Sequence, residues 1–406
     1  MCWNINNQKV MEPVLRLNKT IFTVFLVIIM TGCKPFIEKS GLIQNVIDSI
    51  SLRFIPDHRM GLCDIKAKNG VGGALILCGE TTSPDLKNTI INTLSNNGNK
   101  LIDSILILPD TLTNKKYKGL ATVSVINIRK KPEQSAEMLS QAVLGTPVLI
   151  LKNEDSWLLI QTPDHYIGWT ESSSVETMTA VKMEEWKLSD RVITLVNSGW
   201  IYSSADESGI IGDIVAGSIL VKEGKDHSYT KVRLPDGREG YLNSSSVTDF
   251  NIWKANVKCT GENIVRYAST FIGLPYLWGG TSSKAFDCSG FSKTVYYLNG
   301  YILYRDASQQ ALHGLNVDIT PDQGQMKPGD LLFFGSRENT KLHVTHVAVY
   351  KGDSEYINSS GRVRINSLDF TRSNYNERAK SLLAVKRIIG VADDPGIIPI
   401  NSHPWY

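Results

Sequence analysis

The sequence predicts a multidomain protein in which a small α/β unit and two small all-β barrels precede a larger α+β domain. The chain has 406 residues, which at roughly 100–200 residues per domain is enough for several domains. Two stretches, 120–178 and 188–248, each consist of short strand patterns separated by turn residues, which is typical of small barrels. The stretch 256–392 begins with helical patterns and continues with strands, which indicates an α+β domain.

The composition is that of an ordinary globular protein. Hydrophobic residues make up 42% of the chain and charged residues 20%, and the net charge is +3. This balance excludes a wholly disordered chain. Because Lys and Arg are spread along the sequence without a basic block, we expect no nucleic-acid partner. The sequence has no paired CxxC units and no HExxH motif, so we expect neither a metal nor another cofactor.

Residues 1–33 have the pattern of an export signal. Arg16 and Lys19 precede the apolar run 21–30, and small residues then lead to Cys33. The run is shorter than the ~20 residues that cross a bilayer, so we interpret it as a secretory signal rather than a membrane span. Its end resembles a lipobox, which implies acylation of Cys33 and a membrane-anchored lipoprotein of the cell envelope. The alternative is an ordinary signal peptide in which Cys33 has no special role.

The segment after the signal is expected to be a tether over 34–42, followed by a small α/β unit over 43–112. Two short strand patterns flank a helix whose first turn holds Pro84, a position that suits proline. Cys63 and Cys78 are interpreted as small buried residues, with a disulfide across neighbouring strands as the alternative. The sequence assigns no chemistry to this unit.

The two barrel stretches are similar to each other. The segment TPDHYIGWT at 162–170 and the segment LPDGREGYL at 234–242 match in place and in style. An internal duplication of about 60 residues is the simplest account. The alternative is a pair of unrelated all-β units.

Cys288 lies where a loop rich in glycine and aromatic residues gives way to a helical pattern. A cysteine nucleophile reacts as its thiolate, and a free thiol with a pKa near ~8.5 holds little of it at neutral pH. The start of the helix is expected to favour the negative charge of Cys288. Gly290 is expected to let another backbone segment approach closely.

His346 is the candidate general base. It lies in the strand pattern 343–350, and His343, three residues earlier, points to the opposite face of that strand. The next strand offers Asn358, whose carbonyl oxygen can orient an imidazole. The sequence therefore predicts the catalytic set Cys288, His346 and Asn358.

The order of motifs in this domain resembles the NlpC-type family of cell-wall cysteine peptidases. PYLWGG, DCSGF, KPGDLLFF, HVTHVAVY and YINSSGRV follow one another, with 58 residues from Cys288 to His346 and 12 from His346 to Asn358. The resemblance implies a papain-like catalytic domain. The third catalytic residue of the family is usually a second histidine, so Asn358 is a departure that is expected to slow the reaction without abolishing it.

The two barrel stretches resemble bacterial SH3-like domains. Two such domains before this catalytic domain resemble the γ-D-glutamyl-L-diamino-acid endopeptidases of the dipeptidyl-peptidase VI type. The resemblance implies cleavage of peptidoglycan stem peptides that carry a free N-terminal L-alanine, with release of L-Ala-γ-D-Glu. It also implies that the first SH3-like domain narrows one end of the groove. The substrate-binding positions that it implies are Tyr276, Asp287, Ser289, Ser308, Glu137 and Tyr166.

The chemistry of the substrate agrees with these positions. A buried ammonium needs a carboxylate, and Asp287 and Glu137 are the expected partners. The hydroxyls of Ser289 and Ser308 are expected to contact the free α-carboxylate of D-Glu. The backbone N–H of Cys288 is expected to stabilise the oxyanion.

Two other functions stay open. One is a murein endopeptidase that acts on intact wall and uses the SH3-like domains as wall-binding modules. The other is a wall-binding lipoprotein whose catalytic site has decayed. Whether Glu137 and Tyr166 reach the groove of Cys288 separates the murein endopeptidase from the enzyme with a free-amine requirement.

Overall fold

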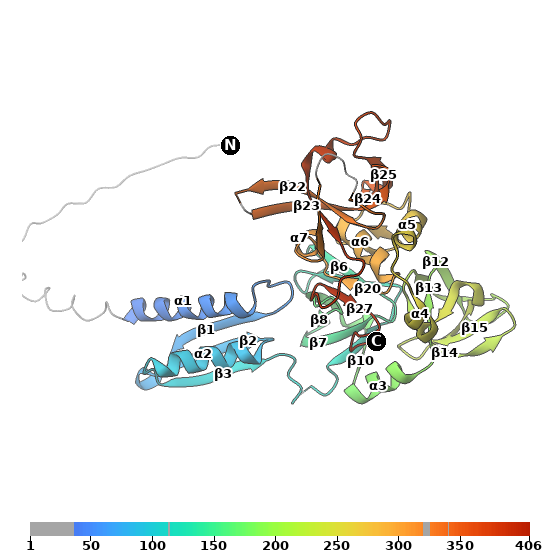
Figure 1. Cartoon of the computed structure of the whole chain (residues 1–406). Coiled ribbons are helices and arrows are strands. Elements are labelled where there is room, and N and C mark those ends of the chain that lie inside the picture. The colour runs from blue at the N-terminus through green and yellow to red at the C-terminus, as the bar shows by residue number, and fades with distance from the viewer. Residues whose placement is uncertain (1–35, 113, 320–324, 340) are drawn as a thin grey trace, which may run out of the picture.

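The computed structural model describes residues 36–112, 114–319, 325–339 and 341–406 (Figure 1). The predicted signal and Cys33 lie outside the described residues. Within these ranges, no helix combines the length and the apolarity that crossing a bilayer requires.

The N-terminal unit is a three-stranded sheet with two helices packed on it. Its elements are α1 (Phe36–Phe54), β1 (Cys63–Asn69), β2 (Leu75–Thr81), α2 (Pro84–Asn96) and β3 (Leu101–Ile107). The Ser83 side chain caps α2 by accepting from the Leu86 N–H, and Pro84 occupies the first turn as predicted. The tether predicted over 34–42 is wrong from Phe36 onward, because α1 already begins there. Ile43 and Ile47 of α1 pack into the core of the unit.

Cys63 and Cys78 do not form the disulfide that the sequence left open. They lie on the adjacent strands β1 and β2, but Cys63 is opposite Thr81 and Cys78 is opposite Lys66. Both thiols are free.

Two seven-stranded β units follow, and their strands have the same order. The first β unit has β4 (Lys118–Ala121), β5 (Val125–Arg129), β6 (Met138–Val143), β7 (Pro147–Glu154), β8 (Trp157–Gln161), β9 (Ile167–Glu171) and β10 (Val175–Met178), in the order β10-β4-β7-β8-β9-β5-β6. The second has β11 (Arg191–Thr194), β12 (Ser198–Tyr202), β13 (Ile210–Val215), β14 (Ile219–Asp226), β15 (Tyr229–Arg233), β16 (Glu239–Asn243) and β17 (Val247–Asp249), in the order β17-β11-β14-β15-β16-β12-β13. Each strand thus has its counterpart in the other unit, which is the pattern that a duplication leaves.

The C-terminal unit places helices on one side of a six-stranded sheet of order β21-β26-β22-β23-β24-β25. Its helices are α5 (Gly261–Thr270), α6 (Cys288–Tyr297) and α7 (Ala307–Gln310). Its strands are β18 (Thr281–Ser282), β19 (Ala285–Phe286), β20 (Tyr301–Leu303), β21 (Leu315–Val317), β22 (Leu331–Glu338), β23 (Lys341–Gly352), β24 (Glu355–Ser360), β25 (Arg362–Ser367), β26 (Leu382–Arg387) and β27 (Ile397–Pro399). The helices and the sheet share one apolar core, which includes Phe271, Phe291 and Phe333.

The units pack on one another through a shared apolar cluster. It joins the two β units, their linking helices α3 (Ala180–Leu188) and α4 (Phe250–Asn256), and the end of the chain. Its buried members include Leu120, Met178, Met183, Trp186, Ile193, Ile219, Phe250, Trp253, Ile302, Ile400 and Tyr406. The chain continues past the predicted domain end at 392, because β27 pairs with β20 and carries Tyr406 back into this cluster.

Candidate active site

Cys288 is the first residue of α6, and a compact turn delivers it there. The Asp287 carboxylate caps the helix by accepting from the Gly290 N–H at 2.7 Å. A Cβ on Gly290 would lie 2.0 Å from the carbonyl oxygen of Gly280, so only glycine allows the loop to pass this close. The close approach predicted at Gly290 is confirmed.

His346 is buried on β23, beside the start of α6. Its Nε2 lies 2.9 Å from Oδ1 of Asn358 on the neighbouring strand β24. The Asn358 amide is itself fixed, because its Nδ2 donates to Oδ1 of Asn366 at 3.0 Å. Asn366 in turn donates to the carbonyl of Asn374 at 3.2 Å. This chain of amides turns the Asn358 oxygen toward the imidazole, so Nε2 carries the proton and Nδ1 is left as the basic nitrogen.

Burial leaves both groups neutral in the resting site. It raises the pKa of the Cys288 thiol to about 11, and the charge of Asp287 adds to this shift. Burial also lowers the pKa of His346 to about 3, assisted by the positive charge of Arg378 and opposed by the hydrogen bond to Asn358. The thiolate that the start of the helix was expected to favour is therefore outweighed by desolvation. A neutral thiol then faces a neutral base.

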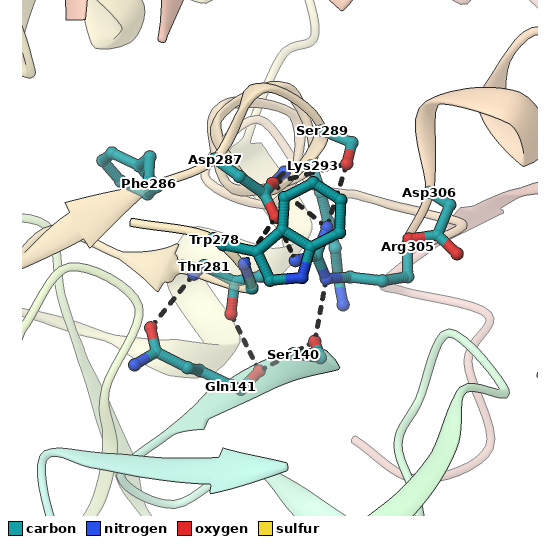
Figure 2. A network of polar contacts seen from close by, with 12 residues as sticks. Ser140, Gln141, Trp278, Thr281, Phe286, Asp287, Ser289, Lys293, Arg305 and Asp306 are labelled. Carbon is teal, nitrogen blue, oxygen red and sulfur yellow. Dashed lines mark hydrogen bonds and ion pairs between the residues drawn. The ribbon is translucent and has the colours of Figure 1, made fainter. Parts of the chain in front are cut away.

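Asp287 has a permanent cationic partner, Arg305 (Figure 2). The guanidinium of Arg305 contacts both carboxylate oxygens of Asp287, at 2.5 and 3.1 Å, and both side chains are buried. Arg305 also donates to the hydroxyls of Ser289 at 2.9 Å and of Ser140 at 3.0 Å. The Gly279 N–H donates to the same carboxylate. The Asp287 carboxylate thus holds the loop before Cys288 in place. Both of its oxygens already accept hydrogen bonds from the protein, so it needs no substrate ammonium as a partner.

The first β unit packs directly against that loop. The Thr281 N–H donates to Oε1 of Gln141 at 3.1 Å, and its hydroxyl donates to the Gln141 carbonyl at 2.8 Å (Figure 2). A Cβ on Gly279 would meet the carbonyl oxygen of Met138 on β6 at 2.6 Å. These contacts bring the start of β6, with Glu137 just before it, to the edge of the site.

One open groove of about 1470 Å³ collects the predicted residues. Its lining includes Cys288, His346, Tyr276, Asp287, Ser289, Ser308, Glu137 and Tyr166. Asn358 stands behind His346, where an orienting residue belongs. The competing histidine, His343, is exposed and lies outside this lining.

The end of the groove carries carboxylates on both sides. The Tyr166 hydroxyl donates to Oδ2 of Asp306 at 3.2 Å. Oε1 of Glu137 accepts from the indole N–H of Trp278 at 3.2 Å. Asp306 precedes α7, and Gln309 completes a capping box there by bonding back to the Asp306 N–H.

Sequence reasoning missed Arg305, Asp306 and Asn366. A signal for the first two was present, since they lie two and three residues before Ser308 in the motif YRDASQQ, where Asp followed three residues later by Gln indicates a helix start. For Asn366 no signal was available, because only the pairing of β24 with β25 brings it beside Asn358.

Replacing Asn358 tests whether it orients the base. Asn358→Ala is expected to lower kcat by about 10-fold or more, because the imidazole loses the acceptor that holds its orientation. Asn358→His is expected to remain active, because its ring offers an acceptor at the same place. Steady-state kinetics on a purified peptide substrate measures both variants. A wild-type rate for Asn358→Ala would remove Asn358 from the site.

Comparisons with known proteins agree with this geometry. The NlpC/P60 family matches residues 273–382, and the bacterial dipeptidyl-peptidase Sh3 domain matches residues 128–175. Dipeptidyl-peptidase 6 of Lysinibacillus sphaericus is 31% identical over 264 residues, which cover 62% of this chain and 92% of that protein. A gamma-D-glutamyl-L-lysine dipeptidyl-peptidase of Bacillus subtilis is 30% identical over 287 residues, which cover 68% of this chain and 86% of the relative.

Solved structures show the same fold. An NlpC/P60 family protein from Bacillus cereus superposes with a TM-score of 0.57 at 21% identity, covering 66% of this chain and 99% of that one. An NlpC/P60 endopeptidase from Photobacterium damselae superposes with a TM-score of 0.50 at 18% identity, covering 80% of this chain and 77% of that one. With its SH3 domain, its cysteine–histidine groove and relatives matched over most of their length, the chain belongs to the NlpC/P60 family of cysteine peptidases.

Proposed function

We propose that this peptidase cleaves the bond between γ-D-Glu and the diamino acid in peptidoglycan stem peptides that carry a free N-terminal L-alanine. One observation carries the proposal: Glu137 and Tyr166 of the first β unit line the same groove as Cys288. A domain that served only to bind the wall has no need to contribute side chains beside the nucleophile. The names of the similar Lysinibacillus and Bacillus dipeptidyl-peptidases support the same substrate class.

The carboxylates at the end of the groove suit a free ammonium. Asp306 and Glu137 are partly exposed there, and the Tyr166 hydroxyl lies between the barrel and Asp306. We assign Asp306 to the ammonium in place of Asp287, because the Arg305–Asp287 pair is buried, whereas the Arg59–Asp306 pair is partly exposed at the groove. The Ser289 and Ser308 side chains also line the groove, and we assign their hydroxyls to the α-carboxylate of D-Glu.

Because the Cys288 thiol and the His346 imidazole are both neutral at rest, the proton is transferred as the thiol attacks. Nδ1 of His346 removes the thiol proton as Cys288 Sγ attacks the γ-carbonyl carbon of D-Glu. The backbone N–H of Cys288 at the start of α6 stabilises the oxyanion. The imidazolium then protonates the leaving amine of the diamino acid. Water, deprotonated by His346, releases L-Ala-γ-D-Glu from the thioester.

The proposed site of action is the cell envelope. The substrate class is a fragment of the wall, and the relatives include a bifunctional muramidase and endopeptidase of Bacillus subtilis. The export signal and lipid anchor at Cys33 belong to the same proposal.

Product analysis tests the reaction. Purified protein incubated with L-Ala-γ-D-Glu-L-Lys is expected to release L-Ala-γ-D-Glu and lysine, identified by mass spectrometry. The peptide with meso-diaminopimelate in place of lysine is tested in parallel. Intact sacculi serve as the comparison substrate and are expected to release no such product. Cleavage of sacculi with no cleavage of the free peptides would favour the murein endopeptidase instead.

A further inference from the structure

The N-terminal unit, to which the sequence assigns no chemistry, forms part of the active-site groove. Its contribution is the α1–β1 loop, residues 55–62, which connects α1 to β1. The groove lining supplied by the unit consists of Pro56, Asp57, His58, Arg59, Leu62 and, from β2, Glu80.

Arg59 connects this loop to the catalytic domain at the end of the groove. Its Nη1 donates to Oδ2 of Asp306 at 2.7 Å and to Oγ of Ser308 at 3.2 Å. The other edge of the guanidinium contacts both oxygens of Asp57, through Nε at 2.8 Å and Nη2 at 2.7 Å. Gln309 of α7 donates to Asp57 at 2.7 Å. One network of ion pairs and hydrogen bonds therefore joins the α1–β1 loop to α7.

The same loop is also attached to the first β unit. The Ile167 N–H donates to the carbonyl of Arg59 at 2.8 Å, and the Gln161 amide donates to the carbonyl of Met60 at 3.0 Å. Leu62 packs on an apolar cluster that includes Leu159. The loop thus spans the seam between the first β unit and the catalytic domain, at the end where Tyr166 and Asp306 meet.

We propose that the α1–β1 loop is the end wall of the substrate groove, and that Arg59 is the latch that holds this wall on Asp306. The latch determines how far a substrate can extend beyond its alanine, so Arg59 is a specificity-determining residue. This inference rests on the proposed function, since it concerns the end of the groove that receives the peptide's N-terminus.

The charges around Arg59 explain why this residue is expected to control the position of the α1–β1 loop. Asp57 and Asp306 both face the Arg59 guanidinium. Without that cation, the two carboxylates that now contact it lose their shared partner, and like charges that are close together repel. Each pair is partly exposed, so neither alone holds the loop strongly. Losing Arg59 therefore both removes the attraction and adds a repulsion.

Two N-acetylated peptides of different length test whether the α1–β1 loop limits the length of the substrate. They are Ac-L-Ala-γ-D-Glu-L-Lys and the same peptide with two glycines between the acetyl group and alanine. Because neither peptide has an N-terminal ammonium, pairing of that group with Asp306 does not enter the ratio of their kcat/KM values. Arg59→Ala and Arg59→Glu are expected to raise the long-to-short ratio at least ~10-fold above wild type. Arg59→Lys, which keeps the cation, is expected to stay closer to wild type.

Arg53→Ala is the matched control, because Arg53 is an exposed arginine on α1 of the same unit, outside the groove. Its ratio is expected to equal that of wild type. Hydrogen exchange of residues 55–62 is expected to accelerate in Arg59→Ala and Arg59→Glu while thermal unfolding of the whole chain confirms that both fold. Binding of the two peptides to Cys288→Ala forms, measured by calorimetry, gives the same ratio without turnover.

An unchanged long-to-short ratio in both Arg59→Ala and Arg59→Glu would overturn the latch. Failure of the proposed function has a different signature, since wild-type protein would then cleave free and acetylated peptides at equal rates. The peptide-length ratio can be read in either case.

Discussion

Cys288→Ala and His346→Ala are each expected to abolish hydrolysis of L-Ala-γ-D-Glu-L-Lys, with kcat reduced at least ~1000-fold. The thiol supplies the electrons for the new bond. The neutral imidazole of His346, which Asn358 holds in place, accepts the proton of the thiol. Because the pKa of the thiol is raised to about 11, little thiolate forms without the base. Removing either group therefore stops the same step.

Two controls separate chemistry from folding. Cys259 is another thiol of the same domain, and burial raises its pKa to about 12, but it lies outside the groove. Cys259→Ala and the exposed His343→Ala are expected to retain activity. Cys288→Ala is expected to unfold at the wild-type temperature. His346→Gln complements His346→Ala, because it refills part of the buried volume beside Phe334 without supplying a base. Near-wild-type turnover in either Cys288→Ala or His346→Ala would show that the nucleophile and base are misassigned.

Acetylation of the substrate's alanine is the second large effect, with kcat/KM expected to fall at least ~100-fold. Acetylation deletes an ammonium that Asp306 and Glu137 would otherwise pair, and it places a neutral amide beside their carboxylates. Breaking a buried pair by removing one partner costs on the order of 3–5 kcal/mol, and partial exposure of these carboxylates keeps the expectation near the lower end. The comparison uses the free and acetylated forms of one peptide.

Substitutions at the end of the groove test which carboxylates pair with the substrate ammonium. Glu137→Ala and Asp306→Asn are expected to shrink the preference for the free amine. Glu133→Ala is the matched control, because Glu133 is an exposed carboxylate of the same loop that does not line the groove. A murein endopeptidase would behave oppositely, since its substrate has this nitrogen tied in an amide. Equal rates on free and acetylated peptides would therefore exclude the free-amine requirement and favour that alternative.

Local sequence was sufficient to predict that Cys288 and His346 lie in one groove and that Asn358 contacts His346. Cys288 and Gly290 stand in one turn of helix, so their roles follow from residues close in the chain. Strand alternation predicted that Val344, His346 and Ala348 share a face, but a β-bulge between Val344 and His346 breaks the alternation, and Val344 packs on the opposite core from Ala348. His346 is nevertheless the buried histidine of β23, as predicted. The hairpin between β23 and β24 is short. The position of Asn358 beside His346 could therefore be predicted without knowledge of the whole fold.

Only the tertiary structure shows how the carboxylates at the end of the groove are paired. The family resemblance implied Asp287 as a partner of the ammonium, and no local pattern in the sequence placed a cation beside it. Folding brings Arg305, which is 18 residues later, into contact with it and leaves Asp306 facing the groove. Arg59 lies 247 residues before Asp306, and no local pattern couples the two. Local periodicity indicates which face a side chain takes where a strand is regular, but residues from distant segments determine which charge it pairs with, because electrostatic pairing depends on distance in space rather than along the chain.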